Sequence, residues 1–351
     1  MTASQAVAER DWEAAVAAIA ASGTTVISCH VNPDGDALGS ALALYLALDG
    51  GGKRALASFS EPFVVPPQYR FLAGLDRLVP PGQAPTDADL FICFDAGSLD
   101  RLGTLVGAFR GAARTIVVDH HASNTRFGEV NLIDPHAPAS AVLCRELLRR
   151  LGLKLDLEIA TCLYTGLVTD TGRFQYQATT PATHLLAAEL LEAGVEQYEV
   201  AKAVFETNEI GYLRLIGATL ARIAQVPEAS LVWTSVTLAD LATHGVDMDQ
   251  TEGLIDLVRT DASSDVAAVL KEQQDGTYKV SLRSKGDTDV GAIATGFGGG
   301  GHQFAAGYSS GLGLEGTVAA LVGVLTTRSP RSSGGANGGS PDPPGGERRR
   351  R

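Results

Sequence analysis

The stretch TTVISCHVNPDGD, residues 24–36, joins a short apolar run to a cluster of polar and charged residues. The apolar run, residues 24–29, predicts a buried strand, because it is rich in β-branched residues and ends at turn-forming ones. Residues 38–48 follow with apolar side chains spaced near the period of a helix. Two more apolar runs, residues 90–94 and 115–118, continue this alternation. Strands that alternate with helices are typical of a parallel α/β sheet.

Further helices are predicted where apolar residues recur at helical spacing with few breakers. The first is an Ala-rich segment without Pro or Gly, which should end at Gly23, where a helix cap is expected. The predicted helices cover residues 2–22, 139–151, 157–168, 185–191 and, in a linker, 198–205. Strand-like patterns return at residues 218–226, 230–237, 265–273 and 277–283. The expected fold class is therefore α/β, with a parallel-sheet N-terminal domain and a smaller mixed α/β C-terminal domain.

Domain boundaries follow from these patterns and from composition. A chain of 351 residues, 45% of them hydrophobic, has enough material for two cores. From residue 329 onward Gly, Pro, Ser and Arg dominate, and such a segment cannot bury enough apolar surface to fold. We expect domains over residues 1–197 and 210–326, a linker helix over 198–209 and a disordered tail over 327–351.

Composition also limits the location and the partners of the protein. No stretch approaches the roughly 20 apolar residues of a membrane span, and the N-terminus is charged, so we expect a cytoplasmic protein without a membrane partner. The four cysteines lie in apolar runs without a C-x-x-C pair, as buried thiols do in a reducing compartment.

The net charge argues against long nucleic acids as ligands. It is −12 overall, and residues 328–351 hold six Arg against Asp342 and Glu347, so the preceding residues carry −16. A duplex-DNA binder needs a basic footprint, which these residues lack. Any nucleic-acid substrate is therefore expected to be small.

Acidic and imidazole side chains follow the predicted strands at the points where the strands end. They are His30, Asp34 and Asp36 after the first strand, Asp95 after the second, Asp119, His120 and His121 after the third, and Asp170 after a predicted helix. Carboxyl ends of parallel strands meet at one edge of a sheet, so these side chains should converge. Bare anions at that density would repel one another, and divalent cations are therefore expected. Carboxylates mixed with imidazoles suit Mn²⁺, while ligand type leaves zinc and iron open.

These clusters resemble the motifs of a known family. HVNPDGDALGS from residue 30, FDAG from 94, VVDHHASN from 117 and TDTGRFQY from 169 resemble the four signature motifs of the DHH phosphoesterases. GGGGHQFAAG from residue 298 resembles the glycine-rich motif of the C-terminal domain that accompanies them. The five blocks occur in the family's order. Within the family, the chain is similar to small bacterial enzymes that degrade nano-RNA and dephosphorylate 3′-phosphoadenosine 5′-phosphate.

The resemblance implies a role for each residue of the clusters. One metal ion would be held by His30, Asp34 and Asp95, and a second by Asp36, Asp95, His120 and Asp170, so that Asp95 is shared. His121 would face the phosphate and protonate or stabilise the leaving oxygen, and Asp119 would orient its neighbours. The implied cofactors are two Mn²⁺ ions, with Mg²⁺ or Co²⁺ as substitutes. Two such ions about 4 Å apart can form a bridging hydroxide and aim it at phosphorus.

An arginine and a run of glycines indicate an anion site in the C-terminal domain. Arginine offers a planar fork that matches phosphate oxygens, and consecutive glycines let backbone N–H groups approach an anion. By resemblance, the substrate would be bound by Arg283, Ser284, Gly298, Gly299, Gly300, Gly301 and His302. Two aromatic residues close behind the fourth acidic cluster, Phe174 and Tyr176, fit a substrate contact or a packed strand equally well.

The expected function is hydrolysis of short single-stranded 5′-phosphorylated oligonucleotides, such as nano-RNA and dinucleotides, to mononucleotides, and of 3′-phosphoadenosine 5′-phosphate to AMP. One alternative is a RecJ-like single-strand DNA exonuclease, although the acidic body argues against it. Another is an inorganic pyrophosphatase, which reads its substrate with a lysine-rich cluster. A third is a non-catalytic nucleotide-binding protein, but every implied ligand is present. A homodimer is left open.

Overall fold

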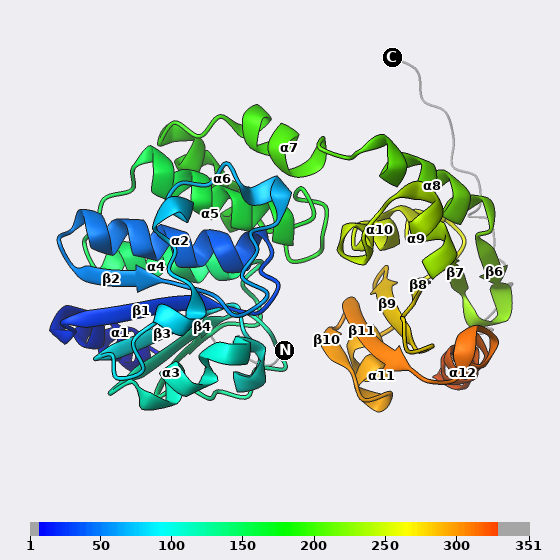
Figure 1. Cartoon of the computed structure of the whole chain (residues 1–351), viewed down its shortest axis with the longest axis horizontal. Coiled ribbons are helices and arrows are strands. Elements are labelled where there is room, and N and C mark those ends of the chain that lie inside the picture. The colour runs from blue at the N-terminus through cyan, green and yellow to red at the C-terminus, as the bar shows by residue number, and fades with distance from the viewer. Residues whose placement is uncertain (1–6, 329–351) are drawn as a thin grey trace, which may run out of the picture.

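A computed structural model describes residues 7–328 and contains two sheets, each packed against helices (Figure 1). The predicted α/β fold class is confirmed, with a parallel sheet in the N-terminal half and a mixed sheet in the C-terminal half. Residues 2–6 of the first predicted helix and nearly all of the predicted disordered tail lie outside the described residues. No helix within the described range combines the length and the apolarity that crossing a membrane requires.

The N-terminal sheet consists of β1 (Thr24–Cys29), β2 (Arg54–Ala57), β3 (Leu90–Phe94), β4 (Thr115–Asp119) and β5 (Val130–Ile133). All neighbours pair in parallel, in the order β2-β1-β3-β4-β5. The order reverses between β1 and β3, and open α/β sheets bind ligands at the carboxyl ends of the strands beside such a switch point. The three predicted strands are confirmed. Strands β2 and β5 were not predicted, because four residues are too few to show a period.

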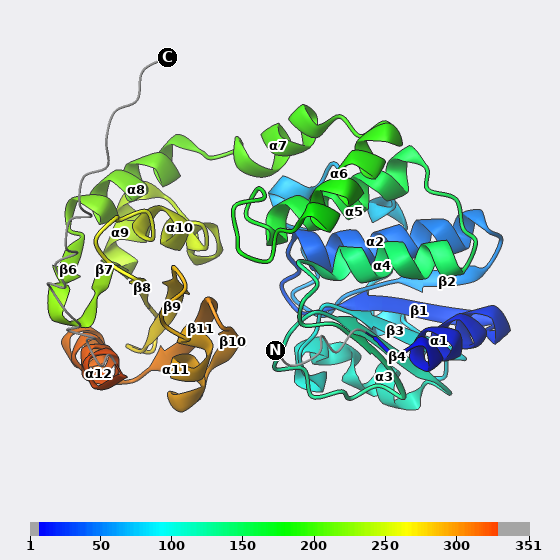
Figure 2. The same ribbon diagram turned by 180° about the vertical axis from the view of Figure 1, so that it is seen from behind.

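The helices of this half are α1 (Glu9–Ala21), α2 (Gly35–Gly50), α3 (Val106–Gly111), α4 (Ser140–Arg150), α5 (Leu157–Asp170) and α6 (Pro181–Glu192). Successive residues of β1 point to opposite faces of the sheet: Ile27 joins the core beneath α2, α4 and α5, and Val26 joins the core beneath α3. Figure 2 shows these two layers from behind. The predicted helices are confirmed, with shifted starts: α2 begins three residues and α6 four residues before the predicted start, and residues 7 and 8 of the first predicted helix are not helical.

Helix α7 (Gln197–Phe205) follows the N-terminal half and leads toward the second sheet (Figure 1). The second sheet consists of β6 (Ala224–Val226), β7 (Leu231–Val236), β8 (Val266–Glu272), β9 (Tyr278–Ser284), β10 (Gly300–His302) and β11 (Ala305–Ser310). Its order is β10-β11-β9-β8-β7-β6, and only β7 and β8 pair in parallel. The boundaries of the two domains and the linker stay a prediction.

The helices of the second half are α8 (Ile210–Ala221), α9 (Leu238–His244), α10 (Leu254–Val258), α11 (Val290–Gly296) and α12 (Gly313–Arg328). Helices α8, α9 and α10 cover one face of the sheet, and α11 and α12 cover the other. Short 3-10 helices complete the chain: η1 (Pro67–Tyr69), η2 (Leu75–Arg77), η3 (Pro81–Gln83), η4 (Leu99–Leu105), η5 (Pro227–Ala229) and η6 (Met248–Thr251).

The prediction of a strand over residues 218–226 is wrong for residues 218–221, which are helical. Helix α8 runs to Ala221, and only residues 224–226 form a strand. The residues that α8 buries are Tyr212, Leu215 and Thr219, spaced three and four apart, so the apolar period there is that of a helix.

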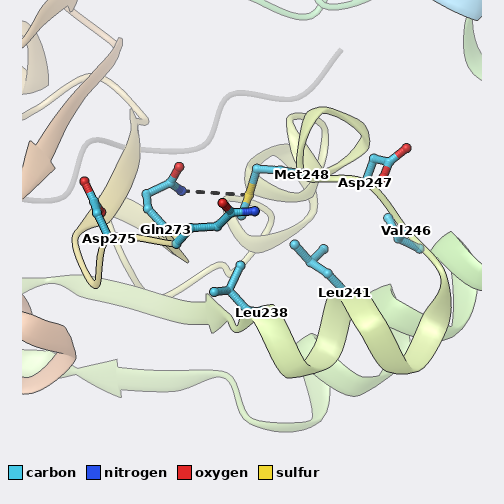
Figure 3. Close-up of a pocket in the computed structure, with 8 residues that line it drawn as sticks. Leu238, Leu241, Val246, Asp247, Met248, Gln273 and Asp275 are labelled. Carbon is cyan, nitrogen blue, oxygen red and sulfur yellow. Dashed lines mark hydrogen bonds between the residues drawn. The ribbon is translucent and has the colours of Figure 1, made fainter.

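A hollow of about 650 Å³ lies between α9 and the β8–β9 turn (Figure 3). Its lining residues are Leu238, Leu241, Val246, Asp247, Met248, Gln273, Gln274 and Asp275. None of them belongs to the predicted acidic clusters or to the predicted anion loop. The hollow is therefore separate from the candidate active site.

Candidate active site

Close packing of α2 against α5 brings two acidic clusters together. A Cβ on Gly39 would lie 2.3 Å from the carbonyl oxygen of Cys162, and a Cβ on Gly166 would lie 2.7 Å from Oδ1 of Asp36. Both distances are below any ordinary contact, so a Cβ at either position would force a neighbouring group to shift. The helices can therefore approach until Asp170, the last residue of α5, reaches the first turn of α2.

Asp34 begins α2 and also faces a histidine. Its Oδ1 accepts hydrogen bonds from the backbone N of Asp36 (3.1 Å) and of Ala37 (3.0 Å), which makes Asp34 the N-cap. Its Oδ2 lies 3.5 Å from Nε2 of His30. The cap explains why α2 starts earlier than predicted: the polar residues of the motif form its first turn.

Two histidines present the same ring nitrogen to the acidic cluster. Nδ1 of His30 donates to the carbonyl of Val31 (2.8 Å), and Nδ1 of His120 donates to the carbonyl of Ala137 (3.1 Å). Since each Nδ1 is used in this way, Nε2 of each ring faces the carboxylates; for His120 it lies 3.0 Å from Oδ2 of Asp170. An imidazole whose Nδ1–H is held by a backbone carbonyl is typical of a metal ligand that binds through Nε2.

Asp95 lies at the centre of the site. Its Oδ2 lies 3.6 Å from Nε2 of His30, and its Oδ1 lies 3.4 Å from Nε2 of His120 and accepts the hydroxyl proton of Ser140 at 3.0 Å. The residue has a φ of 55°, which is unusual outside glycine. Such backbone strain is concentrated at functional sites, where the surrounding structure holds it.

Asp36 is fully buried between two helix starts. Its carboxylate accepts hydrogen bonds from the backbone N of Ser140 (2.5 Å) and of Ala141 (2.9 Å) and from the hydroxyl of Ser40 (3.2 Å). Burial raises the pKa of Asp36 well above its usual range, and the charges of Asp95 and Asp170 raise it further. A site that disfavours its own carboxylate charge in this way is stabilised by a cation.

The donor set fits two metal ions. Ligand atoms of His30, Asp34 and Asp95 all lie within 4.8 Å of one another, and those of Asp36, His120 and Asp170 form a second such group. Burial lowers the pKa of the His30 imidazole, but Asp34 and Asp95 outweigh it and raise the pKa to about 10. The field that attracts a proton there would equally attract a divalent cation. The role of these six residues as ligands stays a prediction.

His121 and Asp119 form a hydrogen-bonded pair beside this cluster. Nδ1 of His121 donates to Oδ1 of Asp119 at 2.7 Å, and Oδ2 of Asp119 accepts from Nδ2 of Asn124 at 2.6 Å. Burial lowers the pKa of His121, but Asp119 and the charge of Asp95 outweigh it, so the pKa is raised. Asp119 thereby orients the ring and favours its protonated form.

His302 reaches the site from the C-terminal half. Its ring stacks on that of His121, with centroids 4.3 Å apart and planes at 23°, and it lies 5.0 Å from the ring of His120. Burial lowers the pKa of His302 to about 3, helped by the charges of the other two histidines. The site therefore combines a protonatable imidazole with a neutral one.

The glycine run before His302 is a strand edge and not a flexible linker. Gly300 and Gly301 pair with β11, and a Cβ on Gly299 would lie 2.1 Å from the carbonyl oxygen of Gly307. Gly298, the first of the run, has a φ of 81°. Glycine is required here by close backbone approach, and the rigid strand holds His302 against the N-terminal half.

Arg283 and Ser284 lie on β9, where acidic residues of their own domain contact them. Nε of Arg283 lies 3.5 Å from Oδ1 of Asp256, and the hydroxyl of Ser284 lies 3.4 Å from Oδ1 of Asp265. The same hydroxyl accepts a hydrogen bond from the backbone N of Gly286. Of the predicted substrate residues, His302 contacts the histidines of the N-terminal half.

Sequence reasoning missed two residues of the site. Arg101 places Nη2 3.2 Å from Nδ1 of His30, and Asn124 supports Asp119. Asn124 lies within the third motif and could have been named from it. Arg101 lies in η4 and follows no period, so only the fold reveals it.

Comparisons with known proteins agree with this geometry. Residues 24–167 match the DHH family, N-terminal domain, and residues 232–319 match the DHHA1 domain. The "Bifunctional oligoribonuclease and PAP phosphatase NrnA" of Thermus thermophilus is 36% identical over 298 residues, which are 84% of this chain and 87% of that protein. A probable NrnA of Streptococcus mutans is 30% identical over 84% of this chain and 92% of its own length.

A solved structure agrees as well. The crystal structure of an exopolyphosphatase-related protein from Bacteroides fragilis superposes with a TM-score of 0.84 at 25% identity, covering 91% of this chain and 96% of that one. Both domain matches, the relatives that span most of the chain and this likeness lead to the same conclusion: the chain belongs to the DHH phosphoesterase family.

Proposed function

We propose that this protein hydrolyses short 5′-phosphorylated oligonucleotides to mononucleotides and 3′-phosphoadenosine 5′-phosphate to AMP, with two Mn²⁺ ions. The observation that carries the proposal is the meeting of two ligand groups at Asp95, in a chain 36% identical to a named oligoribonuclease and PAP phosphatase over 84% of its length. The buried, unpaired cysteines support a reducing compartment, and we propose the cytoplasm. We also propose the domain boundaries predicted above.

The metal ions would be held by His30, Asp34 and Asp95 on one side and by Asp36, Asp95, His120 and Asp170 on the other. When bound, two such ions activate water and neutralise charge that develops on the phosphoryl oxygens. Oxygen-rich ligands with some imidazole favour Mn²⁺ over zinc, and Mg²⁺ and Co²⁺ are the expected substitutes.

The chain's own residues supply the proton and the orientation. Asp119 holds Nδ1 of His121, so the proton that the ring can transfer is the one on Nε2. We propose that His121 donates this proton to the leaving oxygen. His302 stacks on one face of that ring and would shield this face from water.

Charge and position argue for a short substrate. Arg283 would hold a terminal 5′-phosphate while the bond to be cleaved lies at the metal ligands. The residues before 328 carry a net charge of −16, so each phosphate beyond these two contacts meets a protein of net negative charge. Affinity should therefore not increase with the length of the strand.

A graded series of labelled 5′-phosphorylated RNA and DNA strands tests the proposal, with Mn²⁺, Mg²⁺ or Co²⁺. We expect the highest kcat/KM at about two to five nucleotides with Mn²⁺, because only a short strand spans the two sites without meeting the acidic surface. Equal efficiency on a 24-nucleotide strand would point to a RecJ-like exonuclease. Hydrolysis of pyrophosphate alone would point to a pyrophosphatase, and metal or nucleotide binding without turnover to a non-catalytic protein.

A further inference from the structure

A second set of contacts joins the two halves away from the histidines. Tyr176, six residues after Asp170, donates its hydroxyl proton to Oδ1 of Asp256 on α10 at 3.0 Å. Beside it, Nε2 of Gln177 donates to the carbonyl of Lys285 at 3.2 Å. Figure 1 shows α10 on the side of the C-terminal half that faces the N-terminal half. The segment 170–177, which begins at the predicted metal ligand Asp170, therefore contacts the C-terminal half of the protein at its end.

This segment is a left-handed turn, so of the two alternatives left open for Phe174 and Tyr176 the packed strand does not hold. Gly172, Arg173 and Phe174 have φ values of 54°, 60° and 63° in succession. A Cβ on Gly172 would lie 2.3 Å from the ring of Tyr176, so the ring packs directly on the backbone of the turn. On the C-terminal side, the guanidinium carbon of Arg259 lies 4.9 Å from the ring centroid. Tyr176 is thus held from both halves.

Asp256 connects this tyrosine to the predicted phosphate ligand. The oxygen that accepts the proton of Tyr176, Oδ1, is also the atom 3.5 Å from Nε of Arg283. Within the described residues that Nε is buried and makes no hydrogen bond, while Nη1 donates to the carbonyl of Leu282 at 3.1 Å. The Asp256 carboxylate is therefore the counter-charge of the guanidinium. Its side chain is 43% exposed and has room to rotate, and the tyrosine hydroxyl fixes it.

We propose that Tyr176 and Asp256 are positioning residues that hold Arg283 at a set distance from the metal ligands and so make the enzyme selective for 5′-phosphorylated substrates. The inference rests on the function proposed above, in which Arg283 binds the 5′-phosphate. Loss of the hydroxyl releases Asp256, and Arg283 then meets the phosphate from several orientations instead of one. The metal ligands are untouched, so substrate binding weakens while the chemical step does not.

Steady-state kinetics of Tyr176→Phe test this on a dinucleotide with and without a 5′-phosphate. Tyr176→Phe keeps the ring between the turn and Arg259 and removes only the hydroxyl. We expect KM for the phosphorylated dinucleotide to rise about tenfold, as for loss of a hydrogen bond to a charged group, with kcat unchanged and no effect on the other substrate. Asp256→Asn should do the same. Tyr198→Phe, at a tyrosine on α7 that is 59% exposed, is the matched control and should change neither constant.

The same substitution in an Arg283→Ala background separates positioning from general structure. If Tyr176 acts through Arg283, the double variant has the KM of Arg283→Ala alone. A further tenfold rise in that background, or equal rises for both dinucleotides, would overturn the inference and leave the proposed function standing. A wild-type protein that does not distinguish the two dinucleotides, or an Arg283→Ala variant with unchanged KM, would overturn the role of Arg283 and the inference with it.

Discussion

Replacing Gly166 by alanine should damage the metal site with little loss of stability. The new Cβ would lie 2.7 Å from Oδ1 of Asp36 and 3.1 Å from the Cβ of Ala141, where carbon atoms normally stay about 3.5–4 Å apart. Asp36 cannot rotate away without losing its bonds to Ser140 and Ala141. Helix α5 must therefore shift by roughly 0.5–1 Å from α2 to restore normal contact, and Asp170 shifts with it.

The two energetic effects of this substitution nearly cancel. Overpacking costs about 1–3 kcal/mol, and alanine regains about 1 kcal/mol as a better helix former than glycine. The net loss of unfolding free energy without metal is thus about 1 kcal/mol, taking the middle of the overpacking range. Moving the predicted ligands costs more: changes just behind a metal site typically lower metal affinity roughly 10–100-fold.

Isothermal titration with Mn²⁺ and urea unfolding in EDTA measure the two effects separately. The matched control is Gly217→Ala, in the middle of α8, where a new Cβ meets nothing within 4 Å. It should gain about 0.5–1 kcal/mol of stability and bind Mn²⁺ as the wild type does. The reasoning is refuted if Gly166→Ala binds Mn²⁺ with wild-type affinity and is stabilised as much as the control.

Three further predictions follow from single contacts. Asp119→Asn should lower kcat at least about 100-fold while both ions stay bound, because His121 loses the partner that fixes its proton; steady-state rates and metal analysis measure this. Arg283→Ala should leave metal content intact and raise KM for 5′-phosphorylated substrates, which initial rates at varied substrate would show. Glu252→Gln should lower Tm, because Glu252 lies 2.9 Å from the buried ammonium of Lys271. Thermal scans in a Lys271→Met background should show no such decrease in Tm, and an equal decrease there would contradict the ion pair.

The pH dependence of the Glu252 pair has a defined sign. Burial raises the pKa of the Glu252 carboxyl, but Lys271 and Lys279 outweigh it and lower the pKa below its ordinary value. The stability that this ion pair contributes is therefore present above the ordinary pKa of a glutamate and is lost as pH falls through the lowered one. Because the Glu252 side chain is more than half exposed, the effect on Tm should be modest.

The sequence was sufficient to predict those residues of the candidate site that directly follow a strand. His30, Asp95 and His120 follow strands β1, β3 and β4, and the strand order brings those ends together, so the sequence pattern was sufficient. The stacking of His302 on His121 depends on how the two halves meet, which no local pattern encodes. Long elements with a regular apolar period were predicted correctly. Strands of four residues were missed, and the end of α8 was predicted as a strand because its apolar residues were assigned the wrong period.

Contacts between distant segments were the least predictable. Asp256 precedes the end of a five-residue helix and carries no motif, yet it meets Tyr176 eighty positions away and Arg283 on β9. The left-handed turn after Asp170 also escaped prediction, because only Gly172 in it signals a positive φ and its two neighbours are not glycine.

Metal stoichiometry of the wild type and of Asp95→Asn tests the central claim, a two-metal centre that shares Asp95. Metal analysis after equilibration with Mn²⁺ should give two ions per chain for the wild type. Asp95→Asn keeps the size of the side chain and an oxygen for Ser140 but loses the shared charge, so both ions should bind weakly and turnover should disappear. Asp249→Asn, at an exposed aspartate in η6, is the control and should keep both ions. A wild type with one ion, or an Asp95→Asn variant with two tightly bound ions and near-normal turnover, would contradict the account.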